Sequence, residues 1–321
     1  MSLNDLLVIK HISKIFRNRR GSTEIRALDD VTFSIKEGEK IAIIGESGSG
    51  KTTLAKILVG LVQPDEGEII YQGRVIIDKN KKIDDKARKD FGIVFQDPYE
   101  SLNPTKTVFD SISLPLRVRG IKNKELLKEL VYNALMDVGL SPPEEFMRRY
   151  PHQLSGGQRQ RVALARAIIY KPKVLIADEP TTMIDASLKS EIIKLLLNIK
   201  QKFNMTLITI THEFNIARIV ADKLVIMYKG RIVEEGATSE ILKSPKHPYT
   251  QALISSIPSL NSKLQLSFNS YNAITNSYDE KEINTGCKFY FRCPYKLEKC
   301  LNKDPPLFST EKSKVRCFLY E

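Results

Sequence analysis

The sequence predicts an α/β fold, in which helices cover the faces of a parallel β-sheet. Runs rich in β-branched and aliphatic residues, at Lys40–Ile44, Val174–Asp178 and Thr206–Thr211, have the composition of buried strands. Segments with helical periodicity, at 124–138 and 188–203, lie between or after them. Because strands that alternate with helices are joined by crossovers on the faces of a sheet, the expected sheet is parallel.

Two shorter regions add β-structure to this core. The β-like runs at 7–12 and 31–35 precede the first core strand. Near the end of the core, the runs 225–227 and 231–233 are joined by Tyr228-Lys229-Gly230, which predicts a hairpin. Each pattern occurs once, so the sequence predicts one such α/β domain per chain.

Composition narrows the class of protein. The 321 residues include 42% hydrophobic and 27% charged residues, which is ordinary for a water-soluble domain. The net charge of +12 is typical of proteins that meet nucleic acid or an anionic membrane. The lysines are spread along the chain, however, so we interpret them as a solvated surface and predict no nucleic-acid partner. With no apolar run of about 18 residues and no secretory signal at the start, the chain is expected to stay in the cytoplasm.

A glycine-rich loop joins the strand Lys40–Ile44 to a helical pattern at 52–61. It fits the pattern G-x-x-x-x-G-K-[ST], whose backbone N–H groups and helix N-terminus bind phosphates. Its lysine is expected to contact the β- and γ-phosphates of a nucleotide, and its first threonine to bind Mg²⁺. A flexible loop without function would not explain a lysine and a threonine at the start of the helix. The predicted nucleotide-binding residues are Gly45, Glu46, Ser47, Gly48, Ser49, Gly50, Lys51, Thr52 and Thr53.

Two carboxylates follow the second buried strand. Asp178 and Glu179 emerge where open α/β sheets bind their ligands, at the carboxyl end of the strand. Asp178 is suited to hold hydrated Mg²⁺, and Glu179 is suited to accept a proton from an attacking water. An Asp-Glu pair after a strand is common by itself, so its meaning depends on the phosphate loop upstream.

A second set of small residues opens another helical pattern, at 158–169. In the run Leu154-Ser155-Gly156-Gly157-Gln158, the small residues at a helix start form an anion cradle. One domain already has a cradle for its own phosphates, so a second cradle suggests a nucleotide held by another subunit. The alternative is a simple helix cap formed by Ser155. We assign Ser155, Gly157 and Gln158 to the nucleotide of the partner.

Together these motifs resemble the ATP-binding-cassette (ABC) family over residues 7–236. The resemblance implies a P-loop NTPase cassette with a RecA-like core, an antiparallel β subdomain and a helical subdomain at about 97–170. The nucleotide-binding domain is expected to span residues 1–254. ATP and Mg²⁺ are the implied cofactors, and ATP hydrolysis is the implied activity.

The resemblance also assigns roles to four single residues. Phe16 stands where the family places an aromatic ring against adenine, although a core aromatic on an early strand is an equally good interpretation. Gln96 resembles the family's glutamine loop, which contacts Mg²⁺ and water and senses the membrane partner. Asp185 resembles a loop that crosses the dimer interface, and His212 resembles the histidine that contacts the γ-phosphate.

Three segments are similar to one branch of the family, the ATPases of dipeptide and oligopeptide importers. They are residues 96–104, residues 245–253 and the cysteine-containing C-terminus. This branch implies a heterodimer with a second ABC ATPase, two transmembrane permease subunits and an extracellular solute-binding protein, at the cytoplasmic face of the membrane. Residues 96–104 resemble the F-type subunit more than the D-type, whereas Asp178 and its neighbours favour the D-type. Other members of the branch carry nickel or oligosaccharides, and soluble ABC ATPases of DNA repair or translation are a more distant alternative.

All four cysteines lie in a C-terminal tail expected at 286–321, after a Ser- and Asn-rich linker at 255–285. Their spacing lacks the paired C-x₂-C knuckles of zinc ribbons. The resemblance implies a [4Fe–4S] cluster, with a zinc site and free thiols as alternatives. Because a linker precedes the tail, we expect ATP binding to be independent of it. The predicted cluster ligands are Cys287, Cys293, Cys300 and Cys317.

Overall fold

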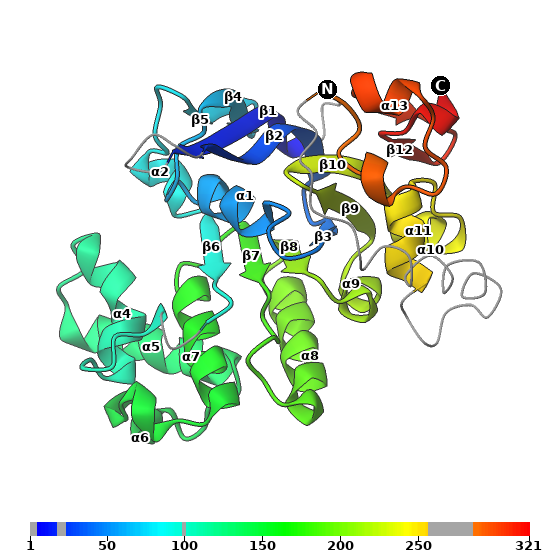
Figure 1. Ribbon diagram of the computed structural model, residues 1–321. Helices are drawn as coiled ribbons and strands as arrows, with labels where there is room; N and C mark the ends of the chain where they lie inside the picture. The colour runs from blue at the N-terminus through cyan, green and yellow to red at the C-terminus, as the bar shows by residue number, and fades with distance from the viewer. Residues whose placement is uncertain (1–4, 18–23, 98–100, 256–284) are drawn as a thin grey trace.

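A computed structural model describes residues 5–17, 24–97, 101–255 and 285–321 (Figure 1). Its smaller sheet is antiparallel, with the strand order β2-β1-β4-β5. Strands β1 (Asp5–Arg17) and β2 (Glu24–Lys36) extend well beyond the two β-like runs of the sequence. Strands β4 (Glu66–Tyr71) and β5 (Arg74–Asp78), which the sequence reasoning did not identify, complete the sheet.

The larger sheet has eight strands in the order β11-β12-β10-β9-β3-β8-β7-β6. Strands β9, β3, β8, β7 and β6 pair in parallel, which confirms the predicted parallel core. Strands β10, β12 and β11 continue it in antiparallel pairing. The strand bounds are β3 Lys40–Ile44, β6 Phe91–Val94, β7 Val174–Asp178, β8 Thr206–Thr211, β9 Lys223–Tyr228, β10 Arg231–Ala237, β11 Phe308–Ser309 and β12 Ser313–Val315.

Alternate residues of the core strands enter two different hydrophobic cores, because successive side chains of a strand point to opposite faces. Ile41 and Ile43 of β3 pack in one core with helix α1 (Lys51–Leu58) and the smaller sheet. Ala42 and Ile44 belong to the other core. Helix α1 is therefore enclosed between the two sheets, which positions the loop that precedes it.

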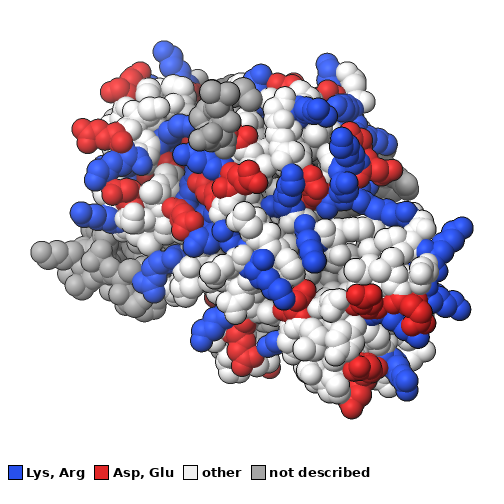
Figure 2. All heavy atoms as spheres, turned by 180° about the vertical axis from the view of Figure 1, so that it is seen from behind, with Lys and Arg blue, Asp and Glu red and all other residues white. Residues whose placement is uncertain are grey.

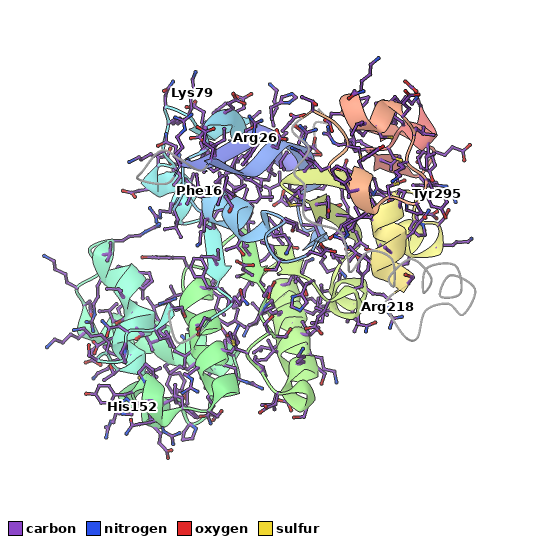
Figure 3. The ribbon with its side chains drawn as sticks, in the orientation of Figure 1. Phe16, Arg26, Lys79, His152, Arg218 and Tyr295 are labelled. Atoms are coloured by element: carbon purple, nitrogen blue, oxygen red, sulfur yellow. The ribbon has the colours of Figure 1, made fainter. Side chains whose placement is uncertain are left out.

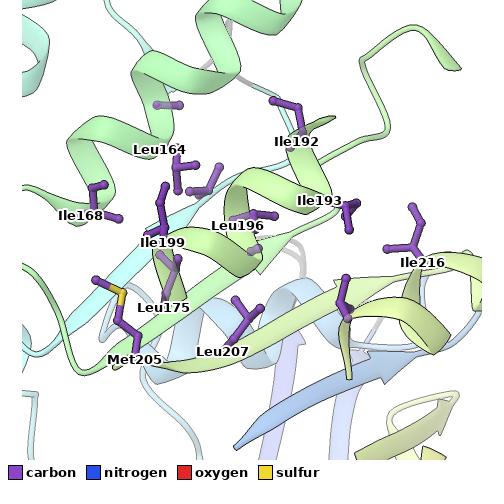
Figure 4. Close-up of a cluster of buried hydrophobic side chains, with 14 of the residues drawn as sticks. Leu164, Ile168, Leu175, Ile192, Ile193, Leu196, Ile199, Met205, Leu207 and Ile216 are labelled. Atoms are coloured by element: carbon purple, nitrogen blue, oxygen red, sulfur yellow. The ribbon is translucent and has the colours of Figure 1, made fainter. Parts of the chain in front are cut away.

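The second core lies under helices on the other face of the large sheet. Helices α7 (Gly156–Ile168), α8 (Ala186–Lys202) and α9 (Phe214–Val220) cover that face. Figure 4 shows side chains of β7, β8 and these helices in contact there. Helix α7 also packs with α4 and α5, and these two pack with α6, in a helical lobe at the lower left of Figure 1. The remaining helices are α2 Asp85–Arg88, α4 Val108–Val118, α5 Lys124–Asp137, α6 Pro143–Arg148, α10 Thr238–Lys243, α11 Pro248–Ser255 and α13 Lys299–Asn302, with 3₁₀ turns at Pro151–Gln153, Tyr290–Arg292 and Phe318–Tyr320.

The predicted hairpin is confirmed as β9 and β10. Its two turn residues, Lys229 and Gly230, have φ angles of 42° and 80°, as the tight turns of β-hairpins require. At Gly230 a Cβ atom would lie 2.9 Å from the carbonyl oxygen of Ala27. A glycine is needed there both for the backbone conformation and for the close approach of β2.

The C-terminal tail is part of the cassette and not a separate unit. Strand β12 adds to the large sheet, with Val315 opposite Glu234 of β10. Val315 and Phe289 are almost fully buried, and Phe289 belongs to the same core as α7 and α8. The linker predicted at 255–285 falls, apart from its first and last residues, outside the described residues. Our expectation that the linker separates the tail from the cassette is wrong for the described part of the tail.

An aromatic cluster holds the tail against the cassette. It consists of Tyr228 at the end of β9, Tyr249 of α11, Phe289 of the tail and the ring of His247. The ring centroids of Tyr228 and Tyr249 are 4.6 Å apart, and Phe289 is 5.3 Å and 5.5 Å from them. His247 is fully buried beside Phe289, and its Nδ1 accepts a hydrogen bond of 3.0 Å from the backbone N–H of Tyr249. Burial lowers the pKa of His247 to about 3.

Because His247 is buried in its neutral form, we expect the unfolding free energy of the protein to fall in mild acid. Below its ordinary pKa of about 6.5, the unfolded chain binds a proton that the folded chain binds only near pH 3. The stabilisation is therefore complete above pH 6.5 and is lost as the pH falls toward 3. Between pH 7 and 5.5 we expect the wild type to lose about 1 kcal/mol more unfolding free energy than His247→Asn. Urea unfolding of both proteins at both pH values measures this difference in unfolding free energy. The buried Glu234, whose raised pKa favours folding as the pH falls, is present in both proteins, so its contribution cancels in the comparison.

The surface carries charges of both signs. Figure 2 shows basic and acidic side chains interspersed over the rear face. Many of these charges are paired across elements, as Lys10 is with Glu68. Among the helices that the structure describes, none is both long and apolar enough to cross a lipid bilayer.

Candidate functional site

The phosphate loop connects β3 to α1 and is enclosed by neighbouring backbone. At Gly45 a Cβ atom would lie 2.3 Å from the carbonyl oxygen of Met227. Gly50 precedes α1 with a φ of 101°, and its Cβ would lie 2.3 Å from the carbonyl oxygen of Ala27. These close contacts explain why glycine stands at both ends of the loop. The loop leads into the N-terminus of α1, where free N–H groups attract anions.

Lys51 is buried inside this loop. Its Nζ donates hydrogen bonds of 2.8 Å to the carbonyl oxygens of Gly45 and Glu46, and a longer one to Ser49 Oγ. Burial lowers the pKa of Lys51, whereas the nearby carboxylates of Glu179, Asp178 and Glu46 raise it. The ammonium group thus lies at the mouth of the anion cradle, held by carbonyl groups of the loop itself.

Asp178 and Thr52 form the part of the site that fits a cation. Asp178 ends β7 and is almost fully buried. Burial raises the pKa of Asp178 to about 6, and a hydrogen bond from the side chain of Thr52 opposes this rise. The Oδ1 atom of Asp178 is buried without a hydrogen-bond partner. An unpaired carboxylate oxygen beside a hydroxyl group is the oxygen-rich donor set that Mg²⁺ prefers.

Glu179 is held in a strained conformation next to this pair. Its φ is 46°, which is rare for a residue other than glycine, and its N–H donates to the carbonyl oxygen of Ile210 at 2.9 Å. The hydroxyl of Thr182 donates to Glu179 Oε2 at 2.9 Å. Glu179 Oε1 lies 3.2 Å from Nδ1 of His212, which follows β8. Because β7 and β8 are parallel neighbours, their carboxyl ends bring Glu179 and His212 together. The contact of His212 with a γ-phosphate stays a prediction.

Gln96 and Phe16 lie at the border of the site. Gln96 follows β6, which pairs in parallel with β7, so Gln96 is at the same edge of the sheet as Asp178. Phe16 is 43% exposed on the smaller sheet (Figure 3) and pairs with Ile25 of β2. Two residues farther along β2, Ala27 contacts the phosphate loop. The exposure of the ring excludes the alternative that Phe16 is a core aromatic, and its contact with adenine stays a prediction.

The second anion cradle lies at the start of α7, close to the first turn of α8. Ser155 caps α7: its hydroxyl accepts from the N–H of Gln158, whose side chain accepts from the N–H of Ser155. A Cβ atom at Gly157 would lie 3.4 Å from Leu188 of α8. Exposed Asp185 precedes α8 without capping it. The simple helix cap is therefore present, and contact with the nucleotide of a partner stays a prediction.

Two contacts of the phosphate loop were missed by sequence reasoning. The backbone N–H of Glu46 donates to the hydroxyl of Tyr249 at 2.9 Å. The Glu46 carboxylate accepts two bonds of 2.9 Å from the guanidinium group of Arg292. Tyr249 and Arg292 lie 203 and 246 residues from Glu46, so no local pattern could have indicated either contact. They contradict our expectation that the tail lies apart from the nucleotide site.

Two family profiles match this chain. Residues 28–182 match the ABC transporter profile, and residues 233–300 match the profile of the oligopeptide/dipeptide transporter C-terminal region. The di/tripeptide transport ATP-binding protein DppF of Pseudomonas aeruginosa is 37% identical over 93% of this chain and 91% of its own length. This chain belongs to the ABC transporter family.

Relatives of this ABC chain include both types of importer ATPase, because D-type proteins match it as well as the F-type DppF. The oligopeptide transport ATP-binding protein AppD of Bacillus subtilis is 35% identical over 99% of this chain and 98% of its own length. The dipeptide transport ATP-binding protein DppD of Escherichia coli is 37% identical over 89% of this chain and 88% of its own length. Because D-type and F-type relatives are about equally similar, the F-type assignment stays a prediction.

Solved structures show the same ABC cassette fold. A dimeric ATP-binding cassette in a post-hydrolysis state with ADP and phosphate superposes with a TM-score of 0.63. The two sequences are 33% identical, and the match spans 72% of this chain and 98% of the other cassette. A cassette of Clostridium perfringens that is part of an ABC transporter complex superposes with the same TM-score, 0.63. Its sequence is 29% identical, and the match spans 82% of this chain and 99% of that cassette.

Proposed function

We propose that this chain hydrolyses ATP to drive a membrane importer of dipeptides or oligopeptides. The observation that carries the proposal is the juxtaposition of buried Lys51, the unpaired Asp178 oxygen and strained Glu179 at one edge of the sheet. The match of residues 233–300 to an oligopeptide/dipeptide transporter region supports the peptide branch. The chain would act at the cytoplasmic face of the membrane with a second ABC ATPase, two permeases and an extracellular solute-binding protein.

The residues of the site take complementary roles in this reaction. Residues 45–53 bind the phosphates through backbone N–H groups and Lys51. Thr52, Asp178 and Gln96 would hold Mg²⁺, which would supply positive charge to neutralise the phosphates. Glu179 accepts a proton from the attacking water, and the contact with His212 keeps its carboxylate oriented. Phe16 stacks on the adenine ring.

The second cradle serves the nucleotide of the partner ATPase. Ser155, Gly157 and Gln158 stand at the N-terminus of α7, where small side chains leave backbone N–H groups open to an anion. Asp185 is exposed at the start of α8, the helix whose Leu188 lies near Gly157, as a residue at a subunit interface would be. ATP would then hold two subunits together head to tail, and its hydrolysis would release them.

Reconstitution tests the proposed solute. The chain, its partner ATPase and both permeases are placed in vesicles with the solute-binding protein, and ATP hydrolysis is measured with di- and oligopeptides, nickel and oligosaccharides. We expect stimulation by peptides alone. Stimulation only by nickel or an oligosaccharide would show that the chain serves an importer of that solute within the same branch of the family. Stimulation by DNA or ribosomes without any permease would instead favour a soluble ABC ATPase.

We propose a [4Fe–4S] cluster as the metal centre of the four cysteines of the tail. All four line one cavity together with Phe289 and neighbouring residues. In the described part of the chain, no three His, Cys, Asp or Glu side chains are grouped as ligands of a single metal ion. A cluster binds each thiolate to a different iron and so needs wider spacing than one ion. Burial raises the pKa of Cys287 to about 11 and of Cys293 to about 12, so ligation must displace protons from these thiols.

This proposal predicts iron and acid-labile sulfide in the native protein. The protein purified anaerobically from iron-replete cells is expected to be brown. It should show a broad absorbance at about 400 nm and contain about four irons per chain. Cys293→Ser should lose most of the colour. Zinc at about one per chain without iron would show a structural zinc site instead. Neither metal would show that the cysteines are free thiols.

A further inference from the structure

Every polar group of Glu46, the second residue of the phosphate loop, has a hydrogen-bond partner. Its carbonyl oxygen accepts from the side chain of Lys51 and the N–H of Ser49, both within the loop. Its N–H donates to Tyr249 of α11, and its carboxylate is paired with Arg292 of the tail. Two of these four partners therefore lie in the C-terminal region.

Arg292 is itself held firmly for a surface residue. It ends the 3₁₀ turn Tyr290–Arg292, between Cys287 and Cys293. Its guanidinium carbon lies 5.7 Å from the ring centroid of Tyr228 and 5.5 Å from that of Phe289. Most exposed ion pairs contribute little to stability, because ordering two flexible side chains costs conformational entropy. A two-bond Arg–carboxylate pair whose guanidinium also stacks on aromatic rings is already restrained, so this entropy cost is smaller.

The position of the Glu46 carboxylate explains what this pair does. Glu46 is itself a residue of the phosphate loop, and its carbonyl oxygen accepts a hydrogen bond of 2.8 Å from Lys51, so its carboxylate lies close to the phosphate cradle. Without a cation beside it, this carboxylate would repel the phosphates of a nucleotide. The two bonds from Arg292 both neutralise it and fix its direction.

We propose that Arg292 and Tyr249 are positioning residues for the phosphate loop, and that through Arg292 the cysteine-containing tail controls nucleotide affinity. The inference rests on the proposal that this loop binds ATP. Arg292 neutralises and orients the Glu46 side chain, and Tyr249 orients the Glu46 backbone. Displacement of the tail removes Arg292, leaves the Glu46 carboxylate unpaired and weakens ATP binding.

A double-mutant cycle tests this inference in the full chain. The dissociation constant of Mg²⁺ with the non-hydrolysable analogue AMP-PNP is measured for Arg292→Gln, Glu46→Gln and the double variant. Arg292→Gln leaves the carboxylate unpaired and should weaken binding about fivefold, which corresponds to about 1 kcal/mol. The double variant should bind as Glu46→Gln does, because the unpaired charge is gone. Arg292→Lys, which keeps the charge but not the two-bond geometry, should restore part of the affinity.

Two further variants separate the possible outcomes. Lys299 of the tail is a matched control, because it also pairs with a carboxylate, that of Glu321, and lies over an aromatic ring, that of Phe318. Lys299→Gln should leave the affinity unchanged, and an equal loss there would overturn the inference. So would additive effects in the cycle, or wild-type affinity in Arg292→Gln while Lys51→Ala loses binding. Unchanged binding in Lys51→Ala would instead refute the phosphate loop as the nucleotide site.

Discussion

Glu179→Gln is expected to lower ATP hydrolysis at this site by at least about a hundredfold while ATP binding stays within a few-fold of wild type. General bases contribute about 10²–10⁴ to the rate of a reaction, and glutamine keeps the shape of glutamate without accepting a proton. The side-chain oxygen that remains can still accept from Thr182, so the strained turn at Glu179 should persist. The rate is measured in the assembled complex with the site of the partner subunit disabled.

A neighbouring carboxylate provides the control for this change. Glu213 follows His212 at the same edge of the sheet, and its carboxylate pairs with Lys189 at 2.8 Å instead of contacting the proposed water site. Glu213→Gln should retain hydrolysis within a few-fold of wild type. If Glu179→Gln retained it as well, Glu179 would not be the general base.

Ser155→Arg is expected to abolish ATP-driven association with the partner ATPase while the isolated chain binds ATP normally. The arginine side chain would fill the cradle at the start of α7 and exclude the phosphates of the partner's nucleotide. Loss of the helix cap adds a stability cost of about 1 kcal/mol, too small to unfold a domain of this size. Light scattering with and without ATP measures the association, and nucleotide titration of the isolated chain measures affinity.

Ser155→Ala separates the two effects. It removes the same capping hydroxyl that Gln158 uses, without adding bulk. We expect weakened but detectable ATP-driven association in this variant. Reduced ATP affinity of the isolated Ser155→Arg chain would place Ser155 in the chain's own nucleotide site and reject the composite arrangement.

Much of the core and the catalytic edge followed from sequence because their determinants are local. Strands β3, β7 and β8 were predicted with the bounds that the structure shows, since short β-branched runs between polar turns leave few other choices. The contact between Glu179 and His212 was not predicted, but the topology explains it, because parallel neighbours bring their carboxyl ends to one edge. Strands β4 and β5 of the smaller sheet lacked so distinct a signal and were missed.

The sequence by itself determined the phosphate loop, the carboxylates after β7 and the cap of α7, because each is a motif of a few adjacent residues. Only the tertiary structure decided how the tail relates to that loop. Strand β12 joins the large sheet at β10, Phe289 enters the main core, and Arg292 reaches Glu46. An ion pair between residues 246 positions apart forms through the packing of whole elements, so it cannot be inferred from the spacing of residues in the sequence. The linker composition therefore suggested an independent tail, whereas burial of Phe289 and the ion pair at Glu46 join it to the nucleotide site.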